Sequence, residues 1–228
     1  MVNFFCISFL AGFWYNKTYR RNMKKIIMKN KDFNLIVAGV GGQGLVTLLN
    51  LATEAAFLEG FDVKTSELHG LSQRGGSVSV FIRFGEEIFS PIVSKGKANL
   101  IIALEEQEAL LALEFSFRET IFIINKFQTP TLAENLSSKQ IGNVLERYKR
   151  KYCFLPASDI CQKELSNNVI AGIFLLGYCL GKGLLPLEKK FFEKAIELVL
   201  PQKHQALNLK AFELGVASSQ KNLCSFKY

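Results

Sequence analysis

Short apolar segments alternate with amphipathic segments along most of this chain. Six segments are apolar runs or alternate with period two, and each predicts a β-strand: residues 34–38, 62–66, 78–84, 100–104, 120–124 and 152–155. Apolar residues at helical spacing follow residues 44, 104 and 137, and Ser137 with Gln140 forms the sequence pattern of a capping box. Strands that alternate with helices predict the α/β class, with an open, mostly parallel Rossmann-like sheet and flanking helices.

The last part of the chain changes to helices, which predicts a helical C-terminal part. Residues 168–180 are apolar and include small residues, Pro186 begins a further helix, and Pro201 begins one that ends near Gly215. Small residues at this spacing let the first of these helices pack closely, either on the sheet or across a subunit boundary. If it does not pack fully on the sheet, we expect it to form an interface with a partner.

A glycine-rich loop joins the first predicted strand to the first predicted helix. Without Cβ atoms the backbone can turn tightly, and the free N–H groups of the helix's first turn can converge on an anion such as phosphate. The alternative is that the glycines only let the helix pack against the sheet. We expect anion binding, and the candidate residues are Gly39, Gly41, Gly42, Gln43 and Gly44.

A second polar, glycine-rich passage follows the second strand, where open α/β sheets bind ligands. Arg74 can donate to phosphate or carboxylate, and His69 can exchange a proton near neutral pH. The structural alternatives are that His69 caps a turn and Arg74 pairs with a surface acid. Because two such loops are expected to meet at one edge of the sheet, we favour function, with candidate residues Glu67, His69, Gly70, Gln73, Arg74, Gly75 and Gly76.

Two groups of residues are expected to be structural. Glu105, Glu106 and Glu108 fall in the first turn of a predicted helix, where acids favour the helix dipole, so we expect helix stabilisers and not catalysts. The five cysteines include no C-x-x-C pair and the only histidines are His69 and His204, so no zinc or iron–sulfur ligand set occurs at recognised spacings. We expect no metal cluster, and unpaired cysteines in a reducing cytoplasm, with Cys179 in the core.

The formal charge of +8 suggests an acidic partner such as nucleic acid. Six basic residues and no acid lie within residues 1–30, however, which leaves 22 basic against 20 acidic residues in the rest of the chain. The body is therefore nearly neutral, and no pattern of interleaved basic and aromatic residues follows, so we expect no nucleic acid partner.

The N-terminal extension is apolar over residues 4–15, which is short of the roughly 20 residues that span a bilayer. Its positive charges follow the apolar run, unlike those of a secretory signal. One alternative is an interfacial anchor; the other, which we favour, is that translation begins at Met23 or Met28. We expect residues 1–27 to be a dispensable extension, 28–215 one domain, and 216–228 a loosely attached tail, with no stable membrane insertion.

Four motifs together resemble a known family. They are the loop over residues 39–44, Glu67-Leu68-His69-Gly70, the run Ser72-Gln73-Arg74-Gly75-Gly76-Ser77, and Asn208 followed by Ala211-Phe212-Glu213-Leu214-Gly215. The chain resembles the gamma-type subunit of 2-oxoacid:ferredoxin oxidoreductases over about residues 31–215, and within that family the indolepyruvate type. The His-Gly and Ser-Gln-Arg-Gly-Gly elements make the resemblance specific, because they do not belong to dinucleotide-binding folds at large.

The resemblance implies a cytoplasmic hetero-oligomer that converts a 2-oxoacid and coenzyme A to acyl-CoA and passes two electrons to ferredoxin. It implies that thiamine diphosphate and iron–sulfur clusters sit on a partner, the alpha-type subunit, and that this chain contributes to the coenzyme A side. No single catalytic residue is assigned, and the chain alone is expected to be inactive. The alternatives are a Rossmann-type NAD(P)-binding enzyme, which the late position of Glu67 disfavours, and an adenylating enzyme, which the missing C-x-x-C pairs disfavour.

Overall fold

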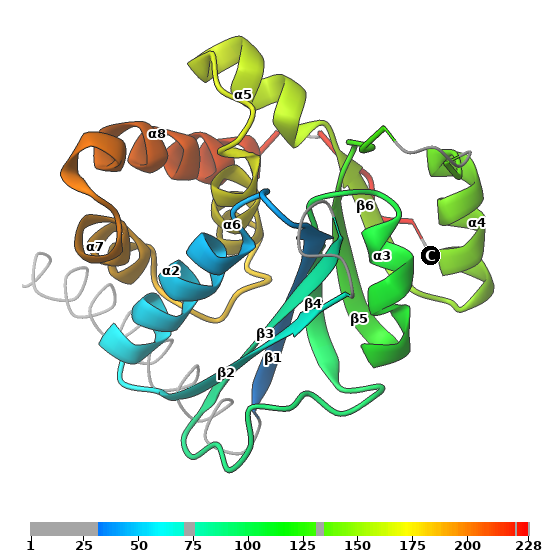
Figure 1. Ribbon diagram of the computed structural model, residues 1–228, viewed down its shortest axis with the longest axis horizontal. Coiled ribbons are helices and arrows are strands. Elements are labelled where there is room, and N and C mark those ends of the chain that lie inside the picture. Colours follow the sequence, from blue (N-terminus) through cyan, green and yellow to red (C-terminus); the bar gives the residue numbers. More distant parts are fainter. Residues whose placement is uncertain (1–31, 71–75, 131–134, 222, 228) are drawn as a thin grey trace, which may run out of the picture.

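A six-stranded sheet with helices on both faces forms the centre of the computed structural model, which describes residues 32–70, 76–130, 135–221 and 223–227 (Figure 1). The strand order is β2-β3-β1-β4-β5-β6, and the β1–β4, β4–β5 and β5–β6 pairs are parallel. The predicted α/β class with a mostly parallel open sheet is therefore confirmed. The strands are β1 (Phe33–Val40), β2 (Asp62–His69), β3 (Ser77–Gly85), β4 (Ala98–Ala103), β5 (Ser116–Asn125) and β6 (Lys151–Leu155).

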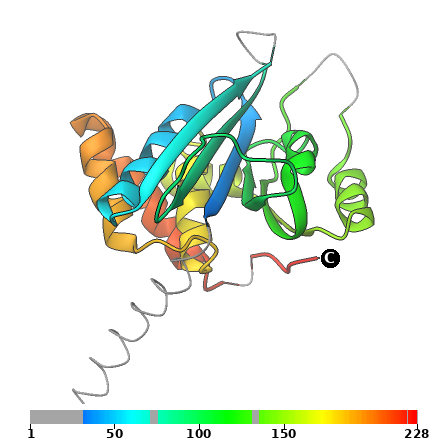
Figure 2. The same cartoon turned by 90° about the horizontal axis from the view of Figure 1, so that it is seen from below.

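The helices divide unequally between the two faces of the sheet. One face carries α2 (Leu45–Leu58), α5 (Ala157–Leu165), α6 (Ala171–Gly181), α7 (Lys189–Val199) and α8 (Gln202–Ser218), and the other carries α3 (Glu108–Leu111), the 3₁₀ helix η1 (Ala112–Phe115) and α4 (Ser138–Arg147). Figure 2, turned by 90°, shows the same two layers on opposite sides of the sheet. Among the described residues, no helix has the length and apolar character needed to cross a bilayer.

β1 lies inside the sheet because its side chains are apolar on both faces. Leu35 and Val37 belong to the larger core, under α2 and α6, whereas Ile36 and Ala38 belong to the smaller core, under α3 and α4. A strand buried on both sides shows no polar alternation. β1 pairs in parallel with β4 and antiparallel with β3, so its carboxyl end meets the β2–β3 hairpin, where Val40 is opposite Ser77.

Helix α6 is an interior helix. Nine of its eleven residues are buried, and its apolar residues surround the whole helix, as expected for a helix enclosed by protein. A Cβ atom on Gly177 would lie 2.1 Å from the Phe212 carbonyl oxygen, and one on Gly215 would lie 2.1 Å from that of Phe174. The backbones of α6 and α8 are thus in contact within one chain. Of the two alternatives left open for this apolar helix, the structure shows packing in the interior, so the condition for a subunit interface is not met.

Two further elements differ from the sequence expectation. The helix expected after β4 is only the single turn α3, which continues as η1, and Glu105 and Glu106 precede it. Helix α5 was not expected, because Ala157, Ser158 and Cys161 are its only buried residues and the apolar pattern is weak. The predicted capping box of α4 is confirmed, with Ser137 as the N-cap and Gln140 as its reciprocal partner.

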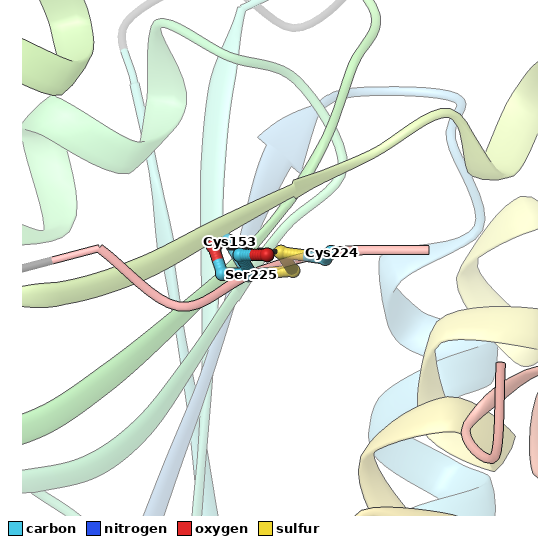
Figure 3. The surroundings of a disulfide bond; sticks show 3 residues. All are labelled: Cys153, Cys224 and Ser225. Carbon is cyan, nitrogen blue, oxygen red and sulfur yellow. Dashed lines mark hydrogen bonds between the residues drawn. A yellow bond between two sulfur atoms is a disulfide. The ribbon is translucent and has the colours of Figure 1, made fainter. Parts of the chain in front are cut away.

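The C-terminal tail is attached to the edge strand β6. Cys153 and Cys224 form a disulfide with their Cα atoms 5.9 Å apart (Figure 3), and Tyr152 exchanges two backbone hydrogen bonds of 3.1 and 3.2 Å with Lys227. The expectation of unpaired cysteines is wrong for this pair, because the fold brings together residues that are 71 positions apart. Cys161 and Cys179 are free and buried, as expected of core residues.

Several predictions concern residues outside the described ranges. They are the extension over residues 1–27 and three members of the second loop, Gln73, Arg74 and Gly75.

Candidate functional site

The glycine loop turns sharply between β1 and α2. Gly42 and Gly44 have φ angles of 99° and 80°, in the left-handed region that favours glycine, and Gly44 is the N-cap of α2. Within the described residues, no acceptor is found for the backbone N–H groups of Gly42, Gly44 or the first three residues of α2. These donors and the positive end of the helix dipole form an anion-binding geometry.

Gln43 stabilises the glycine loop by two hydrogen bonds to Val40. Its side-chain Oε1 accepts a hydrogen bond of 2.8 Å from the Val40 N–H, and its own N–H donates to the Val40 carbonyl oxygen at 3.1 Å. The side chain folds over Gly39, where an added Cβ would lie 2.6 Å from Oε1. Gly39 and Gln43, both predicted as ligand residues, therefore shape the loop through their contacts with each other and with Val40.

The glycine loop and the second predicted loop meet at one edge of the sheet. The Gly41 N–H donates to the Gly76 carbonyl oxygen at 2.9 Å, and the Gly70 N–H donates to that of Ser77 at 2.8 Å. β2 runs in the same direction as β1, with the antiparallel β3 between them, so both loops leave the same side of the sheet. This arrangement follows the rule that open α/β sheets present their binding loops at the carboxyl ends of strands.

A pocket of about 790 Å³ lies between the two loops. It is lined by five residues that the sequence singled out, Gly41, Gly42, Gly44, His69 and Gly70. Four further lining residues were not predicted, because nothing in their types signals a ligand: Leu45, Val46, Thr47 and Val78. Leu45 to Thr47 form the first turn of α2, so the N–H groups of that turn, which have no acceptor in the described part of the chain, belong to the wall of the pocket.

His69 and Glu67 form a pair at the end of β2. They are two residues apart on a strand and so share one face, and His69 Nε2 lies 2.8 Å from a Glu67 carboxylate oxygen. Their side chains are 57% and 35% exposed. His69 lines the pocket whereas Glu67 does not, so the contact with Glu67 orients the imidazole beside the pocket.

A smaller pocket of about 140 Å³ lies on the other side of Gly42 and Gln43, against α5 and α6. Its buried polar residues already satisfy one another. The Asn125 amide nitrogen donates to the Leu104 carbonyl oxygen at 3.1 Å and to Ser158 Oγ at 2.8 Å, and its amide oxygen accepts from the Ser158 N–H. The larger pocket is therefore the candidate site.

Three carboxylates, Glu105, Glu106 and Glu108, lie buried beneath this edge of the sheet, with exposed fractions of 2–7%. Glu105 accepts from the N–H groups of Gln107 and Glu108 at 2.6 and 3.1 Å, which agrees with the predicted helix-stabilising role. Glu108 instead accepts a hydrogen bond from the Ser77 hydroxyl. Burial raises the pKa of Glu105 and of Glu108, despite hydrogen bonds that act in the opposite direction.

Metal or thiol chemistry finds no support in the described part of the chain. No group of three or more His, Cys, Asp or Glu side chains there is arranged to hold a metal ion. Burial raises the pKa of the Cys161 thiol to about 12 and also raises the pKa of the Cys179 thiol, which suppresses the reactive thiolate form of both.

Comparisons with known proteins identify a family and several related chains. Residues 34–218 match the family model described as pyruvate ferredoxin/flavodoxin oxidoreductase. The indolepyruvate oxidoreductase subunit IorB of Pyrococcus horikoshii is 32% identical over 200 residues, which cover 85% of this chain and 98% of that protein.

Solved structures share the fold. Pyruvate oxidoreductase subunit PORC of Thermotoga maritima has a TM-score of 0.64 and 20% identity, over 87% of this chain and all of that one. The 2-oxoglutarate:ferredoxin oxidoreductase of Magnetococcus marinus, solved with 2-oxoglutarate, coenzyme A and succinyl-CoA bound, has a TM-score of 0.65 and 16% identity over 84% of this chain and 31% of that one.

Proposed function

The chain belongs to the pyruvate ferredoxin/flavodoxin oxidoreductase family, and from this premise we propose that it is the non-thiamine subunit of an indolepyruvate-type 2-oxoacid:ferredoxin oxidoreductase. The family match makes it a subunit of a multi-subunit 2-oxoacid:ferredoxin oxidoreductase. The 32% identity to an archaeal IorB subunit, over nearly all of that protein, supports the indolepyruvate type.

The overall reaction removes the carboxyl carbon of the 2-oxoacid as CO₂ and joins the remaining acyl group to the sulfur of coenzyme A. The two electrons released by this oxidation go to two ferredoxins, and the thiol proton goes to solvent. Decarboxylation needs an electron sink such as thiamine diphosphate, and one-electron transfer needs clusters, neither of which side chains supply. The cysteines of the described residues do not fit a cluster, because Cys153 is bonded to Cys224 while Cys161 and Cys179 are buried, and no group of ligands there could hold a metal ion.

We therefore assign both cofactors to a thiamine-diphosphate-binding alpha-type subunit, which also delivers electrons to ferredoxin. In this proposal residues 28–215 form the gamma-type oxidoreductase domain, in a cytoplasmic hetero-oligomer. Purified alone, the chain is expected to be colourless and to reduce no ferredoxin with any 2-oxoacid.

The pocket between the two loops is proposed to bind a phosphate-bearing part of coenzyme A. The observation that carries this proposal is that the N–H groups of Gly42, Gly44 and the start of α2 have no acceptor among the described residues, while these residues line the pocket. Donors of this kind bind phosphate, and the helix dipole favours its charge. His69 also lines the pocket, and Arg74 follows five residues later in sequence, as a candidate for a bidentate contact.

The test compares two glycines in the assembled enzyme. Gly42 and Gly183 both have positive φ angles, and an added Cβ at either position meets no atom within 4 Å. Alanine at either site therefore carries a similar backbone cost of about 1–2 kcal/mol, but only Gly42 lines the pocket. We expect Gly42→Ala to raise the KM for coenzyme A, whereas Gly183→Ala leaves it unchanged.

Arg74→Ala tests the charge contribution, with an expected loss of about 1.5–3 kcal/mol of binding free energy for coenzyme A. The KM for the 2-oxoacid serves as the internal reference, because the proposal places its site elsewhere. An unchanged KM for coenzyme A in both Gly42→Ala and Arg74→Ala would show that this pocket does not bind it.

A further inference from the structure

Ser77, the first residue of β3, joins three parts of the molecule. Its carbonyl oxygen accepts from the Gly70 N–H at 2.8 Å and so closes the β2–β3 hairpin. The preceding carbonyl, of Gly76, accepts from the Gly41 N–H at 2.9 Å and so connects the hairpin to the glycine loop. The Ser77 hydroxyl donates to the Glu108 carboxylate, on α3.

Glu108 is not placed as a helix-stabilising acid would be. A carboxylate in the first turn of a helix normally stays in water near the free N–H groups. Glu108 instead lies 7% exposed and reaches across to β3, while its own N–H is accepted by Glu105. Burying a carboxylate costs free energy unless hydrogen bonds offset it. The negative charge of Glu105 also repels that of Glu108.

We propose that Glu108 is a positioning residue of the site, which acts through Ser77 to hold the His69 and Gly70 wall of the pocket against the glycine loop. Glu108 does not line the pocket. Its effect passes along Ser77 and Gly76 to Gly41, and along Ser77 to Gly70, and both end points are lining residues. The inference rests on the proposed function, because it assumes that the pocket binds coenzyme A.

Loss of the acceptor has a specific consequence. Without Glu108 the Ser77 hydroxyl has no described partner, and the end of the hairpin is held by backbone hydrogen bonds alone. The distance between the glycine loop and the His69–Gly70 wall is then less well defined. A ligand that contacts both must order them on binding, which lowers its affinity. The 2-oxoacid, which binds elsewhere in the proposal, is unaffected.

The experiment measures kcat and both KM values of the assembled enzyme carrying Glu108→Ala, Ser77→Ala or the double change. We expect each single variant to raise the KM for coenzyme A about three- to tenfold, with kcat and the KM for the 2-oxoacid unchanged. The double variant should match the single variants, because both remove the same hydrogen bond.

Glu108→Gln is the conservative variant, and its amide oxygen can still accept from Ser77. It should restore a KM for coenzyme A within about twofold of wild type. Glu114→Ala is the matched control, because this carboxylate is close in sequence but exposed, and it pairs with Lys95 at 2.7 Å. It should leave every constant unchanged.

Two failures can be told apart. If Gly42→Ala and Arg74→Ala also leave the KM for coenzyme A unchanged, the pocket assignment fails. If Gly42→Ala raises it but Glu108→Ala does not, or lowers only the thermal stability, the positioning role is overturned while the pocket assignment stands.

Discussion

The two faces of the sheet are built on different principles. The larger core lies under α2, α5, α6, α7 and α8. These helices also pack on one another, and the backbones of α6 and α8 are in contact. The smaller core lies under α3, η1 and α4, and the three buried carboxylates of the described residues lie next to it, around the start of α3. The first face is fixed by close apolar contact, and the second carries ionisable groups at the candidate site.

The two faces are expected to differ in their tolerance of substitutions and in their response to pH. Close-packed backbones admit no extra atoms, so the larger face is a rigid support. The free energy of a buried carboxylate depends on its hydrogen-bond partners and on its protonation. The stability of the smaller face therefore changes when a partner is removed or the pH is altered. The candidate pocket lies at the edge between them, with α2 from one face and the Glu108–Ser77 contact from the other.

The largest expected effect is at Gly177, and Gly142 on the opposite face is its control. Alanine at Gly177 would place a Cβ 2.1 Å from a backbone oxygen of α8, so we expect Gly177→Ala to lower the free energy of unfolding by more than about 4 kcal/mol.

In Gly142→Ala the nearest atom is the hydroxyl oxygen of Tyr152, at 2.7 Å, which belongs to a buried side chain and not to the backbone. The higher helix propensity of alanine contributes about 1 kcal/mol in its favour, so the loss should be smaller than at Gly177. Urea unfolding midpoints measure both variants, and similar losses in the two would show that the faces are equally tolerant.

The second effect concerns the disulfide at the edge of the sheet. Cys153 belongs to the larger core, and its bond to Cys224 holds the tail on β6. We expect Cys224→Ser to lower the free energy of unfolding by about 3 kcal/mol, because the bond restricts a long loop in the unfolded chain.

Wild type with and without reductant provides the control. Reductant should lower the melting temperature of wild type to that of Cys224→Ser and should not change the variant. Alkylation of both cysteines in native, unreduced protein would show that the bond does not form.

The sequence alone predicts those elements that form because of their own apolar pattern. β1, β4 and β5 were expected because strands buried on both faces are continuous apolar runs, and the glycine loop was expected because tight turns need glycine. The meeting of the two loops followed from the rule for strand ends, although the insertion of β3 between β1 and β2 did not.

Contacts between distant residues were beyond the sequence. Nothing local pairs Ser77 with Glu108, 31 positions later, or Cys153 with Cys224. The interior position of α6 was left open for a related reason, since an apolar helix with small residues suits both a core and an interface. The choice depended on whether α8 would cover it, which is a tertiary fact.

The smallest expected effect is a pH dependence from the smaller face. The pKa of Glu108 is raised in the folded protein above its ordinary value of 4.5, mainly by burial. The folded state therefore binds a proton at Glu108 more tightly than the unfolded state, and the free energy of unfolding falls as pH rises from 4.5 through the raised pKa.

Glu108→Gln removes this dependence and keeps an acceptor for Ser77. The variant and wild type should be similar in stability below pH 4.5, and the variant should be the more stable of the two near pH 7. Urea titrations across that range measure the difference, with Glu114→Gln as the exposed control. A constant difference at every pH would mean that Glu108 keeps its ordinary pKa in the fold, and that the contrast between the faces is one of packing alone.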